Sequence, residues 1–218
     1  MDAAGREKTL SRTQDGSIDD AIILAAGLST RLGRPKALIE VDGEPLINWM
    51  KNNLLTAGIQ RIVVVVHPDL VQHCEGLSDC TIIVNESPQL GRMRSIQLGL
   101  AAIPAGSREH GVLIAPVDRC GWSLDAIRML RRSQPPSAPM TDGRKGHPIT
   151  LDTESIHRIV DCESDTPLRN IVTATGRATS CHHLHLNLDT EEDVARFLTL
   201  NPEDILGQTG SEREEGTR

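Results

Sequence analysis

The chain of 218 residues has almost no aromatic side chains, with one phenylalanine, two tryptophans and no tyrosine. A hydrophobic core must therefore be built from leucine, isoleucine, valine and alanine. The same lack argues against a protein that binds single-stranded nucleic acid, because such proteins stack bases on aromatic rings. The formal net charge of −7 likewise argues against a general affinity for nucleic acid or anionic membranes.

The chain also lacks paired cysteines and long apolar runs. Its five cysteines are odd in number, scattered, and contain no Cys-x-x-Cys pair, which favours reduced thiols over a disulfide framework. No segment reaches the roughly 18 consecutive apolar residues of a membrane span. Residues 1–20 are polar and lack the apolar centre of a secretory signal. We therefore expect a cytoplasmic protein without a membrane segment.

Short apolar runs alternate with amphipathic helical patterns along the chain. The runs, read as strands, are 21–25, 61–66, 81–84 and 111–115. The helical patterns cover 45–57, 93–103, 122–132 and 190–198. Runs that are apolar on both faces are typical of a parallel sheet covered by helices. The pattern predicts an α/β fold, a three-layer α/β/α sandwich with a mostly parallel sheet.

The two ends of the chain differ from its centre. Residues 1–19 and 203–218 show no apolar periodicity. We expect them to be disordered tails around a single domain that covers residues 20–202.

Residues 24–36 form a glycine-containing, cationic segment directly after the first predicted strand. Glycine lets the backbone approach a ligand closely, so that successive amides converge on an anion. Ligands of such sheets gather at the carboxyl ends of the strands. The segment is neither a Walker A loop, because Arg34 and Pro35 follow Gly33, nor a dinucleotide fingerprint, because Gly27 and Gly33 lack a glycine at the required position between them. It predicts a polyphosphate-binding loop, the alternative being an ordinary turn with solvated basic side chains.

The same segment resembles the signature Leu-Ala-Ala-Gly-x-Ser-x-Arg-x-Gly-x-Pro-Lys of the MobA-like NTP transferases, nucleotidyltransferases with a glycosyltransferase-A-like fold. The resemblance covers about residues 21–200 and implies a Rossmann-like nucleotide-diphospho-sugar transferase fold. It implies that these residues bind the nucleotide: Leu24, Ala25, Ala26, Gly27, Ser29, Arg31 and Lys36. Arg31 and Lys36 would hold the β- and γ-phosphates and stabilise the departing pyrophosphate.

Two aspartates match the metal-binding positions of this family. Asp118 follows the run 111–115 in a segment that resembles Pro-x-Asp-x-Pro, with Cys120 in place of the second proline. Asp189 lies in a segment that resembles Asp-x-Asp-Thr-x-Glu-Asp, with Asn187 in the first acidic position. The resemblance implies that Asp118 and Asp189 bind Mg²⁺, which prefers carboxylate and phosphate oxygens. As alternatives, Asp118 is a loop or capping aspartate and Asp189 is the N-cap of the following helix.

Residues 182–190 alternate between polar and apolar side chains, which predicts an extended strand. In such a strand Cys181, His183 and His185 share one face, so a zinc site is an alternative. Neighbouring strand residues seldom form a closed tetrahedral site, and no partner Cys/His pair is present. A polar, exposed face is the better interpretation.

Three further segments resemble the family in places that concern the base and the acceptor. Residues 85–100 match an asparagine followed by Gly-x-x-x-Ser-x-x-x-Gly-Leu, which implies that Asn85 and Ser95 bind the base or ribose. The Gly-His-Pro motif of the molybdopterin-type branch occurs at residues 146–148, which implies that His147 faces the acceptor. Arg169 aligns with a weaker Asp-x-Gly-x-Arg pattern in which Pro167 replaces the glycine. Ser95 as a helix-start residue and His147 as a surface histidine are the alternatives.

Together these features predict a Mg²⁺-dependent nucleotidyltransferase that moves a nucleoside monophosphate to a phosphorylated acceptor and releases pyrophosphate. Arg31, Lys36 and Asp118 are the expected catalytic residues. The resemblance favours CTP and molybdopterin as substrates, and a sugar-1-phosphate or other small-phosphate transferase is the alternative. A non-catalytic nucleotide-binding protein is the alternative of another class, and the departures at Cys120, Pro167 and Asn187 are where loss of turnover would show. The sequence does not decide the base, the acceptor or the oligomeric state.

Overall fold

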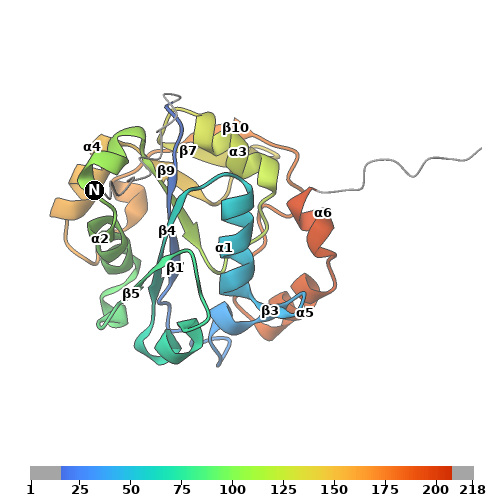
Figure 1. Ribbon diagram of the computed structural model, residues 1–218. Helices are drawn as coiled ribbons and strands as arrows, with labels where there is room; N and C mark the ends of the chain where they lie inside the picture. The colour runs from blue at the N-terminus through green and yellow to red at the C-terminus, as the bar shows by residue number, and fades with distance from the viewer. Residues whose placement is uncertain (1–15, 208–218) are drawn as a thin grey trace, which may run out of the picture.

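The computed structural model describes residues 16–207 and is built around a five-stranded sheet (Figure 1). The strand order is β5-β4-β1-β6-β9, and the first four strands run parallel while β9 is antiparallel to β6. The strands are β1 (Asp20–Ala25), β4 (Arg61–Val66), β5 (Thr81–Val84), β6 (Val112–Pro116) and β9 (Ile149–Leu151). All four strands predicted from the apolar runs are therefore confirmed, as is the mostly parallel sheet. β9 was not predicted, because its three residues are too few to show a pattern.

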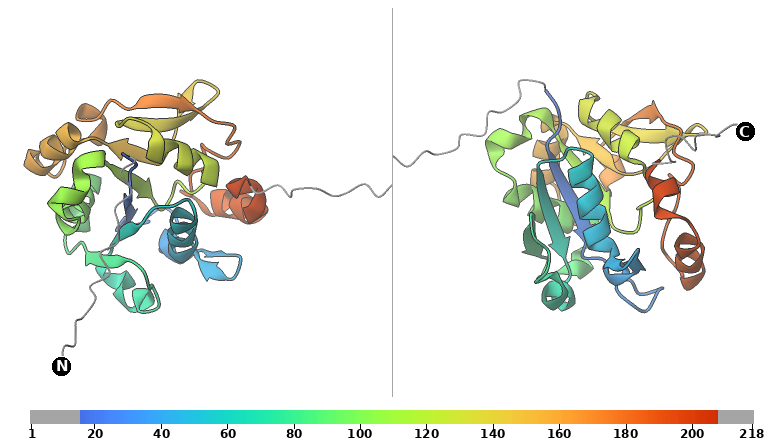
Figure 2. Two further views of the ribbon diagram at one scale, coloured as in Figure 1. Left: turned by 45° about the horizontal axis from the view of Figure 1, so that its top comes forward. Right: turned by 45° about the vertical axis from the view of Figure 1, so that its right-hand side comes forward.

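Helices cover both faces of this sheet, as Figures 1 and 2 show for α1 on one side and α2 on the other. The helices are α1 (Leu46–Thr56), α2 (Arg92–Ala102), α3 (Leu124–Arg132), α4 (Thr153–Asp161), α5 (Glu191–Leu198) and α6 (Pro202–Leu206). Successive residues of β1 alternate between two buried clusters: Ile23 packs in the one that contains α1 and α3, and Ile22 in the one that contains α2 and α4. Both faces of β1 are thus buried, which confirms the three-layer α/β/α sandwich.

Two smaller sheets and several single turns complete the described structure. β7 (Ser137–Thr141) lies between β10 (Thr175–Ala178) and β8 (Arg144–Lys145), and β2 (Glu40–Val41) pairs with β3 (Glu44–Pro45). Short 3-10 segments occur at Lys36–Leu38, Pro68–Cys74, Pro88–Leu90, Ala105–His110 and Leu168–Asn170. The residues between β8 and β9 include His147. Because Ile149 pairs with Ile114 in an antiparallel register, His147 lies beside the carboxyl end of β6.

The predicted strand at residues 182–190 is wrong. Residues 182–185 form a turn, and an irregular segment leads from it to α5. Leu184 and Leu188 are buried and lie four residues apart, so the alternation in the sequence reflects burial of individual leucines and not a pleated strand. The segment finds its backbone partner in a loop, because the Leu188 N–H donates to the carbonyl oxygen of Asp118 at 3.0 Å.

The folded part extends beyond the predicted domain limits of 20 and 202. Ile18 is buried, and its N–H donates to the carbonyl oxygen of Arg131. α6 buries Ile205 and Leu206 against the main cluster. The rest of the predicted tails, residues 1–15 and 208–218, lies outside the described residues. Within residues 16–207 no helix combines the length and the apolar character that crossing a bilayer requires.

Gly99 provides a test of the packing between α2 and β1. A Cβ added there would lie 2.6 Å from Cγ2 of Ile22, which is fully buried. We expect Gly99→Ala to lower the free energy of unfolding by about 1–3 kcal/mol, because the overpacking outweighs the better helix propensity of alanine. Chemical denaturation measures the change. Gly76→Ala is the control, since its Cβ would meet no atom within 4 Å. Equal midpoints for Gly99→Ala and the wild type would show that this contact is not tight.

Candidate active site

The loop after β1 leaves the sheet at its central strand and folds back on itself. Ser29 has a φ of 48°, a left-handed conformation that is uncommon for a residue with a side chain. Its carbonyl oxygen accepts hydrogen bonds from the N–H groups of Leu32 and Gly33, at 3.1 and 3.0 Å. Its Oγ accepts from the backbone N–H of Lys36 at 3.4 Å. One serine thus closes the loop and brings Lys36 back beside the carboxyl end of β1.

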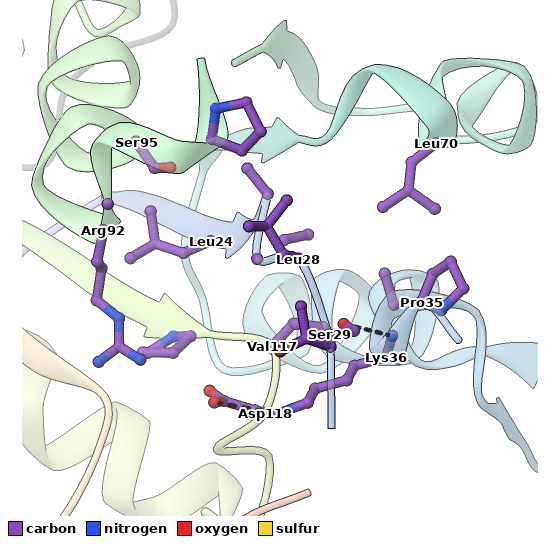
Figure 3. Close-up of a pocket in the computed structure, with 18 of the residues that line it drawn as sticks. Leu24, Leu28, Ser29, Pro35, Lys36, Leu70, Arg92, Ser95, Val117 and Asp118 are labelled. Carbon is purple, nitrogen blue, oxygen red and sulfur yellow. Dashed lines mark hydrogen bonds and ion pairs between the residues drawn. The ribbon is translucent and has the colours of Figure 1, made fainter. Parts of the chain in front are cut away.

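A cavity of about 420 Å³ lies at the carboxyl ends of β1 and β6 (Figure 3), and we call it the first cavity. Eight of the predicted site residues line it: Leu24, Ala25, Ala26, Gly27, Ser29, Lys36, Ser95 and Asp118. The fold therefore gathers these residues from the β1 loop, the start of α2 and the end of β6. A cavity of this size at this edge of a parallel sheet suits a small-molecule ligand.

Asn85, by contrast, does not line the first cavity. Its side chain is buried, and its Nδ2 donates to Ser95 Oγ at 3.0 Å while its Oδ1 accepts from the N–H of Ser87. The structure therefore shows Asn85 fixing the orientation of Ser95, and any effect on a ligand passes through that hydroxyl.

A smaller cavity of about 140 Å³ adjoins the first and holds the charged residues. Lys36 Nζ lies 2.7 Å from Asp189 Oδ1 and 3.7 Å from Asp118 Oδ2. Arg31 reaches the other oxygen of Asp189 at 3.0 Å, and Asn187 Nδ2 donates to that oxygen at 2.7 Å. The hydrogen bond from Lys36 is the main reason why the pKa of Asp189 falls to about 2, with Asn187 and Arg31 adding to it. Asp189 is therefore ionised throughout the physiological range.

Asp118 and Asp189 are 71 positions apart in the sequence and meet through a backbone hydrogen bond. Asp118 lies two residues after the end of β6, and the N–H of the intervening Val117 donates to the carbonyl oxygen of Leu24. The Asp118 carbonyl then accepts from the N–H of Leu188, which sets the next residue, Asp189, beside it. Cys120 is completely buried in the core cluster, so the cysteine that replaces the family proline acts as a packing residue.

The structure rejects Asp189 as the N-cap of the following helix. Thr190 is the N-cap of α5, and its Oγ accepts from the N–H of Asp193 while the Asp193 carboxylate accepts from the N–H of Thr190. This capping box satisfies the helix start. The carboxylate of Asp189 is thus left for Lys36 and Arg31.

The oxygen atoms of this cluster fit a hard divalent cation. Two carboxylates contact one ammonium group, and Oδ1 of the neighbouring Asn187 is buried with no hydrogen-bond partner among the described residues. Oxygen donors of this kind suit Mg²⁺, which takes one or two carboxylates and completes its shell with water and phosphate. Within residues 16–207, no group of three or more His, Cys, Asp and Glu side chains is placed to hold a metal ion. The structure does not support the zinc alternative, because Cys181 is buried and its thiol donates to the carbonyl oxygen of Gly121.

A second cavity, of about 550 Å³, lies on the other side of the start of α2. His147 and Arg169, the two predicted acceptor-side residues, both line it. Apolar side chains make up much of the wall, among them Met93, Ile149, Leu168 and Val172. Gly91 and Arg92 line the first and the second cavity alike, so the two cavities meet at the beginning of α2.

His147 is held in its neutral form. Its pKa falls to about 4, chiefly because of burial and in part because of the positive charges of Arg92 and Arg119, which outweigh the opposing effect of Asp118. At physiological pH its imidazole therefore offers one donor and one acceptor nitrogen and no charge.

Sequence reasoning missed several residues that line these cavities. Arg92 and Gln89 lie inside the segment 85–100 that matched the family pattern, but at positions the pattern leaves unspecified. Leu70 comes from the turn after β4, where no motif exists. The one feature of the sequence that could have indicated Arg92 as a cavity residue is its position directly after Gly91 at a helix start.

A sequence profile of the MobA-like NTP transferase domain matches residues 21–180. Nicotine blue oxidoreductase of Paenarthrobacter nicotinovorans is 31% identical over 144 residues, which cover 60% of this chain and 69% of that protein. A 2-C-methyl-D-erythritol 4-phosphate cytidylyltransferase of Nocardia farcinica is 31% identical over 138 residues, 59% of either protein. The molybdenum cofactor cytidylyltransferase of Escherichia coli is 27% identical over 154 residues, 69% of this chain and 78% of that protein.

Solved structures share the fold at low sequence identity. A protein of Mycobacterium tuberculosis H37Rv, crystallised in complex with manganese, superimposes with a TM-score of 0.69 at 18% identity and covers 84% of this chain and 98% of its own. The CTP:phosphocholine cytidylyltransferase of Streptococcus pneumoniae gives a TM-score of 0.60 at 17% identity, over 83% of this chain and 97% of its own. These likenesses confirm the predicted fold class.

Gly121 tests how the segment before α5 is held. A Cβ added there would clash with the carbonyl oxygen of His183, which is backbone and cannot swing away. We expect Gly121→Ala to push the 182–185 turn outward and to weaken the hydrogen bond from the Leu188 N–H to the Asp118 carbonyl oxygen, which sets Asp189 beside Asp118. Binding of Mn²⁺, measured by electron paramagnetic resonance, should weaken by about tenfold or more if both carboxylates are ligands. Gly76→Ala again serves as the control, and unchanged binding in Gly121→Ala would refute the link between this turn and the carboxylates.

The lowered pKa of His147 predicts a pH dependence of stability. Between its ordinary pKa of about 6.5 and its folded value of about 4, the unfolded chain takes up a proton that the folded chain does not. The free energy of unfolding should therefore decrease as the pH falls through this window. Urea denaturation at pH 7, 6, 5 and 4 should show a shallower decrease for His147→Asn than for the wild type. Parallel pH profiles for the two proteins would contradict this prediction.

Proposed function

The chain belongs to the MobA-like NTP transferase domain family, and on this premise we propose that it transfers a nucleoside monophosphate from a nucleoside triphosphate to a phosphorylated acceptor. The observation that carries the proposal is the ammonium of Lys36, which contacts both Asp118 and Asp189 at the edge of the first cavity. Transfer between two phosphate groups requires positive charge, because both substrates are anions. Lys36 supplies part of that charge, and the two carboxylates can hold a divalent cation that supplies more.

The first cavity would hold the nucleoside triphosphate. The β1 loop lines it with backbone from Ala26 to Ser29, and the hydroxyl of Ser95 faces it from α2. Lys36 and Arg31 would bind the β- and γ-phosphates, which requires Lys36 to exchange its carboxylate partners for phosphate oxygens. Their charges would then stabilise the departing pyrophosphate.

Asp118 and Asp189 would hold a divalent cation, for which we propose Mg²⁺. A bound cation of this type neutralises phosphate oxygens and makes the phosphorus more electrophilic. The task of the two carboxylates is to fix that charge beside the position of the α-phosphate. The manganese complex of the related fold supports a divalent cation here.

The reaction needs no nucleophile from the protein. An oxygen of the acceptor phosphate forms a bond to the α-phosphorus, and the bond from that phosphorus to the β-bridging oxygen breaks. The electron pair leaves with pyrophosphate, next to Lys36 and Arg31. The protein contributes alignment of the two substrates and neutralisation of their charges.

CTP is our proposed nucleotide, because two of the relatives described above are cytidylyltransferases by name. Molybdopterin is the proposed acceptor, supported by the Gly-His-Pro segment at 146–148 and by the relative from Escherichia coli. The differing acceptors in the names of the relatives make another small phosphate the alternative. All five cysteines are free thiols, which supports a reducing compartment such as the cytoplasm.

Pyrophosphate release in the presence of Mg²⁺, with each of the four nucleoside triphosphates and with candidate acceptors, tests this function. We expect release with CTP that depends on the acceptor and stops when the metal is chelated. No release with any pair, together with turnover of nicotine blue, would contradict the proposal and favour the activity for which the Paenarthrobacter relative is named. Binding of CTP without release under any condition would favour a non-catalytic nucleotide-binding protein.

Lys36→Ala separates the role of the ammonium from that of the carboxylates. We expect the rate of pyrophosphate release to fall by about 100-fold or more, because the variant loses a positive charge that stabilises the departing pyrophosphate. Binding of Mn²⁺ should become tighter, because the competing ammonium no longer occupies Asp118 and Asp189. Asp118→Asn should lower both the rate of pyrophosphate release and the affinity for Mn²⁺.

Arg34→Gln is the matched control from the same loop. Arg34 pairs with Glu191 outside the cavities, and both side chains are largely exposed, so solvent screens the attraction between them. Rates in this variant should stay within about twofold of the wild type. Weaker Mn²⁺ binding in Lys36→Ala would show that Lys36 does not compete with the cation.

A further inference from the structure

The two large cavities share only Gly91 and Arg92. Arg92 is the first residue of α2, and Figure 3 shows its side chain extending from the helix toward the end of β6, on the side where Asp118 lies. The long side chain therefore stands at the boundary between the proposed nucleotide site and the acceptor side.

Unlike the two paired arginines of the loop after β1, Arg92 has no ion-pair partner among residues 16–207. Arg31 pairs with Asp189 and Arg34 with Glu191. The guanidinium of Arg92 forms no ion pair or hydrogen bond with any residue between 16 and 207. A guanidinium is always charged and carries five donors in a plane that matches a phosphate or carboxylate. At the junction of two cavities, these donors are available to a ligand.

The charge balance of the proposed reaction shows what Arg92 would bind. Arg31 and Lys36 serve the triphosphate, and both belong to the β1 loop. The acceptor brings a second phosphate, which has to approach the first against electrostatic repulsion. The neighbouring His147 is neutral, and the ammonium of Lys145 already donates to the carbonyl oxygen of Ala174. Arg92 is the cation that lines both cavities.

We propose that Arg92 binds the phosphate of the acceptor and turns it toward the nucleotide, and that the acceptor is a phosphate monoester whose body lies in the second cavity. This inference rests on the proposed function. The wall of the second cavity combines apolar side chains such as Met93 and Val172 with the cations Lys145 and Arg169 and one carboxylate, Asp165, so that with Arg92 the cations outnumber it. It therefore favours an anionic acceptor with a partly apolar body over one that carries an ammonium group.

Phenyl phosphate is a suitable probe, because it joins a phosphate monoester to an apolar ring. Isothermal titration of phenyl phosphate into the wild type, Arg92→Gln and Arg94→Gln measures its binding without any turnover. Arg94 lies on the same helix, two residues further on, and lines neither cavity, so Arg94→Gln is the matched control. A parallel titration with CTP and Mg²⁺ reports on the nucleotide site, and thermal unfolding reports on folding.

We expect Arg92→Gln to weaken phenyl phosphate binding by about 10- to 100-fold, the loss typical of hydrogen bonds to a charged group. Arg94→Gln should bind phenyl phosphate and CTP like the wild type, and Arg92→Lys should recover part of the affinity for phenyl phosphate. CTP binding should fall less than phenyl phosphate binding in Arg92→Gln, because Arg31 and Lys36 would hold the triphosphate. Equal affinity of Arg92→Gln and the wild type, or no saturable binding to the wild type, would overturn the inference. If the wild type does not bind CTP, that result contradicts the proposed function. Weaker phenyl phosphate binding in Arg92→Gln would then still support Arg92 as a phosphate-binding residue.

Discussion

The contact of one ammonium group with two carboxylates is the interaction on which the candidate site depends. Lys36 Nζ lies 2.7 Å from Asp189 and 3.7 Å from Asp118, and these residues come from three segments far apart in the sequence. Two carboxylates this close would repel each other without a positive charge between them. Lys36 provides that charge in the described structure, and a divalent cation would provide it in the proposed reaction. The same geometry therefore stabilises the resting protein and would suit the proposed metal ion.

The surrounding structure fixes these three residues through the backbone. Ser29 closes the loop that carries Lys36, while the hydrogen bond from the Leu188 N–H to the Asp118 carbonyl aligns the two aspartates. Gly121 permits the 182–185 turn to pack directly on the loop after β6. Backbone contacts of this kind are stiffer than long side chains, so the site would keep its geometry if Lys36 and Arg31 exchanged the aspartates for phosphate, as proposed. Arg92 then marks the place where a second anionic substrate would enter.

The strands, the main helices and the phosphate-type loop could be predicted because each rests on local pattern. β1, β4, β5 and β6 are apolar on both faces, and the sequence shows them as uninterrupted runs. Residues 182–190 were predicted wrongly because an alternating pattern also arises when single leucines are buried in an irregular segment. Asn85 was expected to touch the ligand, yet it is buried and orients Ser95, a distinction that depends on which way one side chain turns.

What the sequence determined by itself was the fold class, the family resemblance and the chemical types of residue available to a site, because these follow from periodicity and from motifs of fixed spacing. The tertiary structure alone decided which backbone contact sets Asp189 beside Asp118, that Thr190 and not Asp189 caps α5, and that Arg92 borders two cavities. These are contacts between segments separated by tens of residues. They depend on strand order, on the close approach at Gly121 and on the path of a loop, none of which leaves a local pattern in the chain.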